Sequence, residues 1–298
     1  MTATTDSDAV LGLAAAVDPV GSGEPSASGG RSGRNWAAIV SPLVVLAVFA
    51  LVWEYMHRDG MRRFFDKPGF LLPSLVTVID QSFLDATVRR QMLEGLMWTT
   101  VAALVGLAVS IVLGTVIAVL MAQASWIERS LYPYLVAAQA IPVLAIVPLI
   151  GSVFGGGMFA RIFVCVMISI FPIVTNTLFG LISVDRAQHE LFTLRSASRW
   201  TRLRKLQFPS ALPSIFVGYR ISAGLSVIGA VVGEQFFRAG QKPGIGVVVE
   251  QFRQKARFPQ VYGGLIVASL LGILVFFIFG AIAKAVIGNW HESDNRAP

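Results

Sequence analysis

Polar and charged side chains gather in residues 185–213, a stretch that lies between two long apolar segments. It holds six cations, namely Arg186, Arg195, Arg199, Arg202, Arg204 and Lys205. Its composition predicts short helices over residues 187–195 and 199–208, closed by Pro209 and Pro213. Such a charged segment cannot lie in hydrocarbon, because its polar groups would lose water without replacement. We therefore expect it on a water-facing side, where it offers a surface to a partner.

The chain carries no residue pattern that predicts catalysis. The phosphate-binding sequence Gly-x4-Gly-Lys-Ser/Thr is missing. His189 and Glu190 begin like a zinc-protease motif, but Thr193 stands where the second zinc ligand would be. The other histidines, His57 and His291, are far from this one in the sequence and form no metal-ligand cluster with it. We therefore expect a chain that is not an enzyme and holds no metal or cofactor.

Composition places the chain among integral membrane proteins. Hydrophobic residues make up 55% of its 298 residues, charged residues make up 14%, and the mean hydropathy is +0.69. A net charge of +7 would suit nucleic acid in a soluble protein, but here most charges flank apolar runs, where cations meet lipid headgroups. The lipid bilayer is thus an expected partner and nucleic acid is not. The single cysteine, Cys165, excludes an internal disulfide.

The apolar segments predict an all-α fold with six transmembrane helices. Each is long enough for a hydrocarbon core of about 30 Å, and together they cover residues 36–55, 96–122, 132–154, 159–183, 214–237 and 261–287. Shorter helices are expected over residues 75–84 and 245–254. Residues 1–35 are rich in Ala, Gly and Ser and predict a disordered tail, and residues 288–298 predict a short polar tail. Residues 36–287 form the membrane domain.

Two of these spans carry small residues at every fourth position. The second span has Ala102, Gly106, Ser110, Gly114, Ala118 and Ala122, and the fifth has Ser214, Gly218, Ser222, Ser226 and Ala230. A stripe of small residues lets another helix approach closely, which matters in lipid because the hydrophobic driving force is missing there. The stripes predict a close helix–helix seam, either inside one subunit or between two.

Five residues are candidates for contact with a transported solute: Gln139, Pro142, Asn176, Arg220 and Glu234. Prolines interrupt the third and fourth spans, and broken spans free backbone groups that must be buried or line a wet cavity. Gln139 and Asn176 lie beside these prolines, where interhelical hydrogen bonding is an equal alternative. Arg220 is expected in the first two turns of the fifth span and Glu234 near its far end, and charges at such depths are costly and often functional.

The central stretch resembles the signature loop of ABC-importer permeases, Glu-Ala-Ala, three residues, Gly, nine residues and Ile-x-Leu-Pro. Glu190 takes the place of the Glu, Ser196 that of the Gly, and residues 206–209 (LQFP) that of Ile-x-Leu-Pro, without a gap. Leu191 and Phe192 replace the two alanines. The segments FPIVTNT (171–177), ASRW (197–200), PSALPS (209–214), GYR (218–220) and GIG (244–246) also resemble the nitrate, sulfonate, taurine and thiamine-precursor branch.

This resemblance implies a type I importer permease with a cytoplasmic coupling helix between the fourth and fifth spans. The helix would dock on a separate ATPase subunit through Glu190, Leu191, Phe192, Leu194, Arg195, Ser196, Arg199 and Trp200. A membrane-surface helix is the alternative for this loop. The replacement of Gly by Ser196 puts a tight turn there in question.

The same resemblance implies an assembly in the cell membrane, with both termini cytoplasmic, since the charges of the loops do not decide orientation. Its expected parts are two ATP-binding subunits that bind the ATP, a second permease copy and an extracytoplasmic substrate-binding protein. The chain would then move a small polar or aromatic solute inward by alternating access. Residues 138–142 (AQAIP) and the Phe-rich spans resemble the pyrimidine and flavin-precursor members. The alternative is an ion-coupled secondary transporter without an ATPase.

Overall fold

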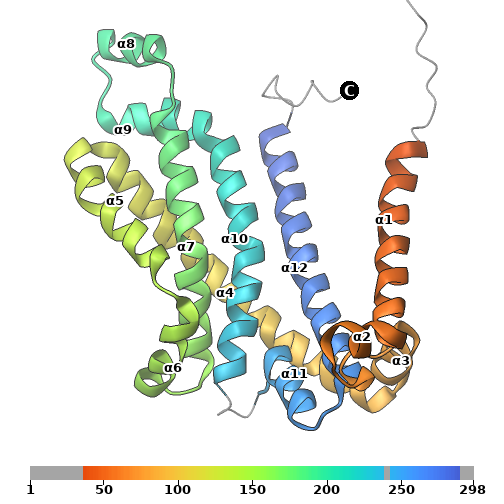
Figure 1. The fold of residues 1–298 in the computed structure, drawn as a ribbon. Coiled ribbons are helices and arrows are strands. Elements are labelled where there is room, and N and C mark those ends of the chain that lie inside the picture. Colours follow the sequence, from red (N-terminus) through yellow and green to blue (C-terminus); the bar gives the residue numbers. More distant parts are fainter. Residues whose placement is uncertain (1–35, 238–241, 289–298) are drawn as a thin grey trace, which may run out of the picture. The chain divides into compact units, whose positions relative to one another are not determined.

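The computed structural model describes residues 36–237 and 242–288, and within them every regular element is a helix (Figure 1). The expected tails, residues 1–35 and 288–298, lie outside the described residues except for Gly288. The long helices are α1 (Trp36–Tyr55), α4 (Ala86–Gln123), α7 (Met158–Ile182), α10 (Phe208–Phe236) and α12 (Phe258–Ile287). The chain divides into two units, residues 1–49 and 50–298, so α1 crosses their boundary.

Shorter helices connect the long ones. Before α4 come η1 (Met56–Gly60), α2 (Met61–Phe65), η2 (Gly69–Leu71), α3 (Leu75–Ile79) and η3 (Asp80–Leu84). Between α4 and α7 come α5 (Ser125–Ala140) and α6 (Val143–Phe154), and between α7 and α10 come α8 (Arg186–Leu194), α9 (Arg199–Arg202) and η4 (Leu203–Gln207). The last is α11 (Ile245–Gln254), which precedes α12. The expected short helices over 75–84 and 245–254 are confirmed.

The helical segments agree with six spans, although the second, third and fifth begin earlier than predicted. Five described segments are long and apolar enough to cross a membrane: Val40–Phe65, Ala86–Gln123, Met158–Ile182, Arg199–Phe236 and Phe258–Ile287. The sixth is a broken pair, because α5 and α6 are bent by 94° at Ile141 and Pro142. The third span was predicted to start at Tyr132, but its helix begins at Ser125. Pro142 has no amide hydrogen and restricts Ile141 to an extended backbone, which explains the break.

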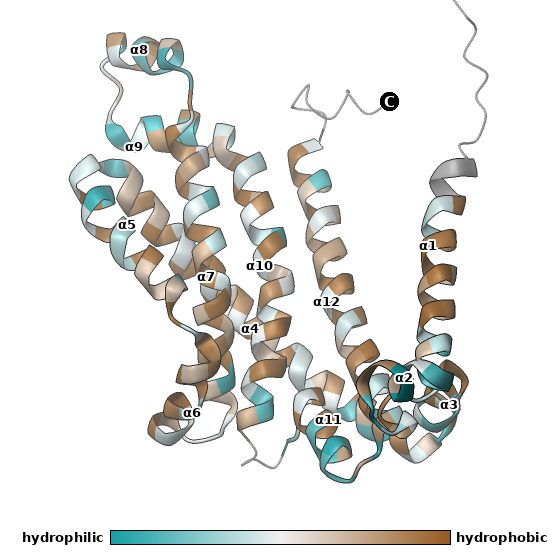
Figure 2. Ribbon diagram, in the orientation of Figure 1, coloured by the Kyte–Doolittle hydropathy of each residue, from teal (hydrophilic) through white to brown (hydrophobic). Residues whose placement is uncertain are grey.

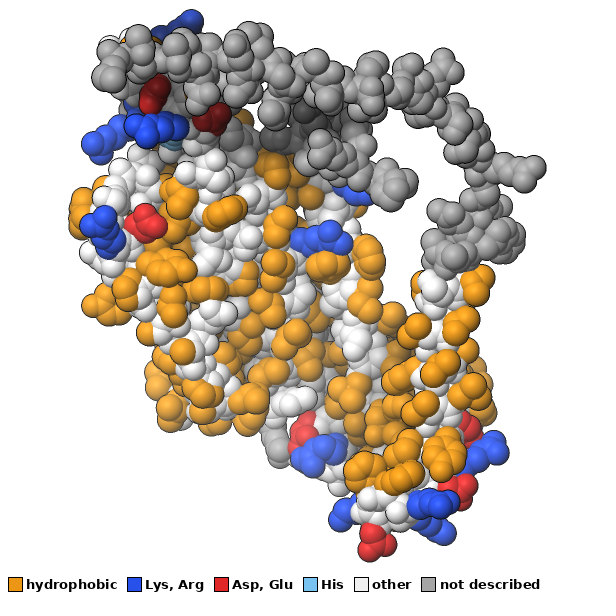
Figure 3. Space-filling model, turned by 45° about the horizontal axis from the view of Figure 1, so that its top comes forward, with side chains coloured by type: hydrophobic (Ala, Val, Ile, Leu, Met, Phe, Trp, Pro, Cys, Tyr) orange, Lys and Arg blue, Asp and Glu red, His pale blue; other side chains and the backbone are white. Residues whose placement is uncertain are grey.

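Within the second unit, the long helices are apolar and the short helices at their ends are more hydrophilic. Apolar residues predominate along α4, α7, α10 and α12, whereas hydrophilic residues gather at α8 and α9 at one end and at α2 and α11 at the other (Figure 2). In the space-filling view, apolar side chains cover much of the visible face and Lys and Arg side chains gather toward its ends (Figure 3). A chain with this distribution places its middle in hydrocarbon and its ends in water.

The two stripes of small residues meet the same helix, α7, inside one subunit. A methyl group on Gly106 of α4 would overlap the side chain of Cys165, and one on Gly218 of α10 would lie 2.8 Å from the carbonyl oxygen of Pro172. Hydroxyl groups also join the three helices, since Ser110 and Ser169 Oγ atoms lie 2.8 Å apart and Ser222 Oγ donates to the Ser169 carbonyl at 2.6 Å. The choice left open by the sequence is therefore settled in favour of an internal seam.

Candidate functional site

The loop between α7 and α10 is a folded helical element. Asp185 caps α8 by accepting a hydrogen bond from the Ala187 amide at 3.0 Å. At the other end, the Ser196 amide donates to the Thr193 carbonyl at 2.9 Å and the Ala197 amide to the Phe192 carbonyl at 3.0 Å. This pair of bonds is a Schellman motif, and Ser196 takes its left-handed position with φ of 50°. The tight turn that the serine put in question is therefore present.

The residues expected to meet an ATPase lie together on this loop and are largely exposed. The side chains of Leu194 and Trp200 are 84% and 69% exposed, and Leu191 is more than half exposed. These exposed apolar side chains lie on the same loop as the six cations of residues 185–213. Glu190 forms an ion pair with Arg186 at 3.1 Å, and Arg195, Ser196 and Arg199 are also exposed. Phe192 is half-buried.

Buried leucines fasten the loop to two of the spans. Leu203 of η4 packs in one cluster with Leu181 at the end of α7 and Ile215 of α10. Leu206 of η4 is also buried. The Arg202 guanidinium donates to Thr193 Oγ1 at 3.2 Å and thereby joins α9 to α8. Contacts therefore link α8 through α9 and η4 to the ends of α7 and α10.

The five candidate pathway residues do not form one site. Gln139 and Pro142 are exposed at the break between α5 and α6, and Glu234 lies near the end of α10, far along the helix from Arg220. Asn176 donates from Nδ2 to the Pro172 carbonyl of its own helix at 2.8 Å, so this hydrogen bond is not between helices.

Asn176 also borders a mixed polar and aromatic pocket of about 410 Å³ between α5 and α7. The groups that line it are a carboxylate, a phenol, a hydroxyl, an amide and apolar side chains, from Glu128, Tyr132, Thr175, Asn176, Leu178, Phe179 and Ile182. A volume in this range and a few polar groups among apolar ones are typical of small-molecule sites.

Arg220 stands further along its helix than the sequence suggested. Its helix begins at Phe208 and not at residue 214, so Arg220 stands 12 residues into α10, in the fourth turn and not in the first two. Its guanidinium carbon lies 4.0 Å from the centroid of the Phe276 ring of α12. This is a cation–π contact between two spans.

Glu234 is fully buried in a polar network at the opposite end of α10 from η4. Its carboxylate accepts hydrogen bonds from Thr99 Oγ1 of α4 at 2.8 and 3.0 Å and from the Gly246 amide of α11 at 3.0 Å. Thr99 Oγ1 in turn accepts from the Ile245 amide at 2.8 Å. The carboxylate and the hydroxyl therefore satisfy amides in the first turn of α11, where the helix dipole also favours a negative charge.

An arginine from a third span completes this network. Arg161 of α7 is 3% exposed, and its Nη1 lies 3.9 Å from Glu234 Oε1 and donates to the Lys242 carbonyl at 3.0 Å. Lys242 Nζ lies 4.1 Å from the ring centroid of Trp98 in α4. Glu234 thus joins α4, α7, α10 and α11 near the end of α10, and it is fully buried.

Glycines allow α11 to approach this carboxylate. A methyl group on Gly244 would overlap the Glu234 carboxylate, and one on Gly246 would lie 2.5 Å from the Val231 carbonyl oxygen. Sequence reasoning noted the two glycines and Glu234 but missed Thr99 and Arg161. Arg161 could have been identified from the sequence, because it lies at the fourth position of α7 and an arginine inside a span needs an anionic partner.

The fold, the membrane-length helices and the folded loop between α7 and α10 together define a polytopic transport permease. Residues 110–288 match the family described as the binding-protein-dependent transport system inner membrane component. The chain belongs to this family of ABC-importer permeases.

Two curated relatives share about a third of the sequence. The formylaminopyrimidine transport permease protein of Halalkalibacterium halodurans is 34% identical over 82% of this chain and 92% of its own length. The riboflavin transport system permease protein of Chloroflexus aurantiacus is 32% identical over 87% of this chain and 92% of its own. The bicarbonate transport system permease protein of Synechococcus elongatus is 27% identical over 80% of this chain and 85% of its own length.

A solved structure supports the fold. The structure described as a bacterial ABC transporter involved in the import of the acidic polysaccharide alginate matches with a TM-score of 0.53 and 13% identity, over 85% of this chain and 99% of that one. The protein is thus a multi-pass membrane subunit of an ATP-driven importer. The alternative of an ion-coupled secondary transporter is not supported.

Proposed function

We propose that this permease imports a flat, nitrogen-containing heterocycle of the pyrimidine or flavin type. The observation that carries the proposal is the similarity to the formylaminopyrimidine and riboflavin permeases, at 34% and 32% identity over most of each chain. The bicarbonate permease is less similar, at 27%. Inorganic anions are therefore the second class of solute in this proposal.

The pocket between α5 and α7 has groups that suit such a ring. The Glu128 carboxylate and the Asn176 amide oxygen can accept hydrogen bonds from ring N–H or amino groups, and the Phe179 ring offers an aromatic face. Asn176 Nδ2 is held by the Pro172 carbonyl, which orients the amide. Among the five candidate residues, Asn176 is thus assigned to solute contact, and Gln139 and Pro142 to the hinge at the break between α5 and α6.

Uptake by cells or proteoliposomes that contain the whole transporter tests the solute class. Labelled riboflavin and formylaminopyrimidine should accumulate in the presence of ATP, and bicarbonate and nitrate should not. Asn176→Ala should raise the KM for the heterocycle about tenfold, since one lost hydrogen bond to a polar solute is worth about that factor. Ser152→Ala, at an exposed serine of α6, is the control. Transport of the anions with no heterocycle uptake would contradict the proposal.

The proposal extends to the assembly. Two separate ATP-binding subunits hold the ATP, a second copy of this chain completes the membrane domain, and a binding protein delivers the solute. This chain then has no catalytic activity and no cofactor of its own. The loop at 185–213 and both termini lie in the cytoplasm, and the segments at 56–92 and 238–259 face the binding protein.

ATP would act on the spans through the α8 loop. Glu190 through Trp200 would dock on the ATPase, with Leu191, Leu194 and Trp200 as apolar contacts and Glu190, Arg195 and Arg199 as polar ones. Closure of the ATPase pair would move α8, and the buried leucines of η4 would carry that motion to α7 and α10. Because ATP binds the two states of the ATPase pair with different affinity, the spans would alternate between inward- and outward-facing arrangements.

A further inference from the structure

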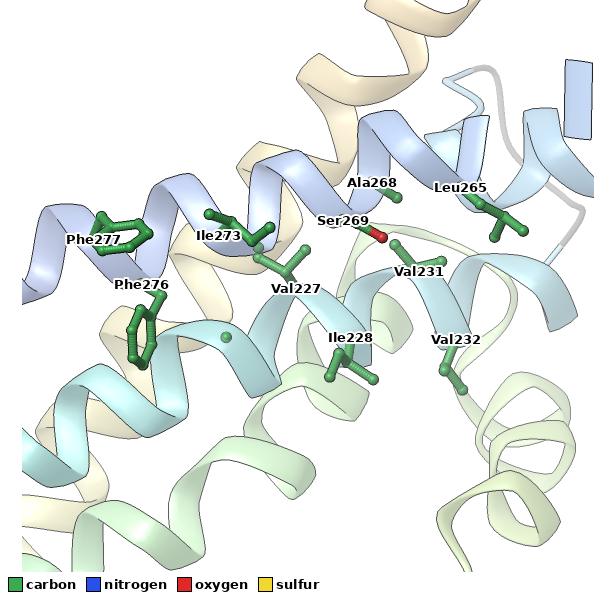
Figure 4. A pocket seen from close by; sticks show the side chains of 12 residues that line it. Val227, Ile228, Val231, Val232, Leu265, Ala268, Ser269, Ile273, Phe276 and Phe277 are labelled. Atoms are coloured by element: carbon green, nitrogen blue, oxygen red, sulfur yellow. The ribbon is translucent and has the colours of Figure 1, made fainter. Parts of the chain in front are cut away.

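An apolar groove of about 660 Å³ runs between α10 and α12 (Figure 4). Its lining is hydrocarbon, aromatic or glycine, apart from Ser269. Small residues open it, since a methyl group on Gly224 would meet nothing within 4 Å and one on Gly272 would only approach Val227 at 3.9 Å. On α12 the lining extends from Leu265 to Phe277, which is about 18 Å at 1.5 Å per residue.

A cation stands at one end of this groove. Arg220 lies one helical turn before Gly224, and its guanidinium rests on the ring of Phe276, which itself lines the groove. The Arg220 Nε is buried and has no hydrogen-bond acceptor, and among residues 36–237 and 242–288 no carboxylate forms an ion pair with this arginine. On the other side, a methyl group on Gly280 would lie 3.4 Å from Nε.

The level of these residues in a bilayer follows from the length of α12. Its 30 residues are about 45 Å long, so a hydrocarbon core of about 30 Å, centred on the helix, leaves about five residues outside at each end. Gly280, and Arg220 beside it, then lie within a turn of the core boundary nearest Ile287. The groove, at residues 265–277 of α12, lies wholly inside the core and crosses its middle, so an acyl chain from the leaflet of Arg220 occupies the end of the groove nearest Phe276.

We propose that this groove binds an anionic phospholipid, with one acyl chain along α10 and α12 and the phosphate on Arg220. The hydrocarbon lining suits an acyl chain, and the guanidinium at headgroup depth suits a phosphate, which arginine binds with paired hydrogen bonds. The Phe276 ring holds the guanidinium in place. Neither the solute nor the ATPase takes part in this site. In this proposal Arg220 contacts lipid and is no longer a candidate for contact with the solute.

Two other occupants fit less well. A helix of a second copy would fill the groove with hydrocarbon but would leave Arg220 without a counter-charge. The buried carboxylate among the described span residues, Glu234, is already bonded to Thr99 and Gly246 at the other end of α10. A polar solute would find one hydroxyl, that of Ser269, along the whole groove.

Native mass spectrometry of the purified full-length permease tests the proposal, with phosphatidylglycerol and phosphatidylcholine of identical acyl chains as probes. The unaltered protein should bind phosphatidylglycerol more tightly. Arg220→Gln should lower that affinity about tenfold, toward the value for phosphatidylcholine, because the charge-assisted contact is lost. Lys284→Gln, an exposed cation in the last turn of α12, should change it less than twofold. Gly272→Leu should lower binding of both lipids alike by filling the groove.

Two results would overturn the proposal. One is equal lipid binding by the unaltered protein, the Arg220→Gln variant and the Gly272→Leu variant, with each variant shown to be folded by an unchanged elution profile and thermal transition. The other is a spontaneous disulfide between two Ser269→Cys chains in native membranes, because it would place a second copy in the groove. The native thiol of Cys165 is buried and would not contribute to such a bond.

Discussion

At the scale of single residues, Glu234 is a fully buried carboxylate that depends on hydrogen-bond donors around it. A fully buried carboxylate is stable in a membrane protein only when donors surround it, and here a hydroxyl, an amide and a guanidinium do so. Each donor comes from a different part of the chain. Removal of the carboxylate would leave Arg161 as an uncompensated charge and would take an acceptor from the Gly246 amide and the Thr99 hydroxyl.

We therefore expect Glu234→Ala to lower the free energy of unfolding by about 3 kcal/mol, as for other broken buried ion pairs. Glu234→Gln should cost about 1 to 2 kcal/mol, because its amide oxygen still accepts from Thr99 and Gly246 but carries no charge. Unfolding in mixed micelles, followed by circular dichroism, measures both. Glu128→Gln, at a partly exposed carboxylate of α5, is the control. Equal stability of all four proteins would show that the network contributes nothing.

Sequence reasoning identified part of this network. Glu234 was noticeable because a charge inside a span is rare. Gly244 and Gly246, at the start of α11, were noticeable because the GIG segment resembles the family. Thr99 was not, since it lies 135 positions from Glu234 and only the packing of α4 on α10 brings them together. The spacing of residues along one helix does not show which residues of another helix pack against it.

At the scale of elements, α8 was predictable and its last turn was not. Its composition predicted a helix over residues 187–195, and the helix spans Arg186–Leu194. The turn after it depends on two backbone hydrogen bonds, which hold Ser196 at positive φ although a serine does not favour that conformation. The sequence predicted a weakened turn, because a serine stands at position 196 where a glycine would favour the turn, and the sequence does not show the two backbone hydrogen bonds.

Ser196→Gly should stabilise this turn by about 1 kcal/mol, because glycine adopts the left-handed conformation without a steric cost. Hydrogen exchange of the last amides of α8 should slow about fivefold. Ser198→Ala, two residues further on, should instead destabilise the loop, because the Ser198 Oγ caps α9 by accepting from the Thr201 amide at 3.2 Å. Faster exchange in Ser196→Gly would contradict the assignment of the turn.

The same element carries the coupling hypothesis. Glu190→Arg and Leu194→Asp should each reduce recovery of the ATPase subunit with the purified permease by tenfold or more, about the effect of losing one interface anchor. Both side chains are exposed, so the membrane fold should be unaffected. Arg186→Gln breaks the ion pair with Glu190 without reversing its charge and should have little effect. Full ATPase recovery and full transport in both variants would place the docking surface elsewhere.

At the scale of the whole molecule, the number and order of the spans followed from hydropathy, because 20 apolar residues in succession have few alternatives to a span. Breaks were predicted at Pro142 and Pro148 in the third span and at Pro172 in the fourth, but Pro148 and Pro172 lie inside continuous helices and only Pro142 stands at a break. The angle of that break, 94°, depends on how α6 packs on α7. Orientation could not be predicted from charge. Cations flank the spans at both ends of the second unit, so the positive-inside rule has no asymmetry to read.

Orientation can instead be measured by thiol labelling, since the one native cysteine, Cys165, is buried within α7 and should not react. Cysteines introduced as Leu194→Cys on α8 and Phe70→Cys on η2 stand at exposed positions near opposite ends of the second unit. We expect a membrane-impermeant maleimide to label position 194 in inside-out vesicles and position 70 in right-side-out vesicles, because α8 should meet a cytoplasmic ATPase. The unaltered protein is the control for both. Labelling in the reverse pattern would place α8 outside the cell, where no ATPase could reach it, and the coupling role of α8 would have to be abandoned.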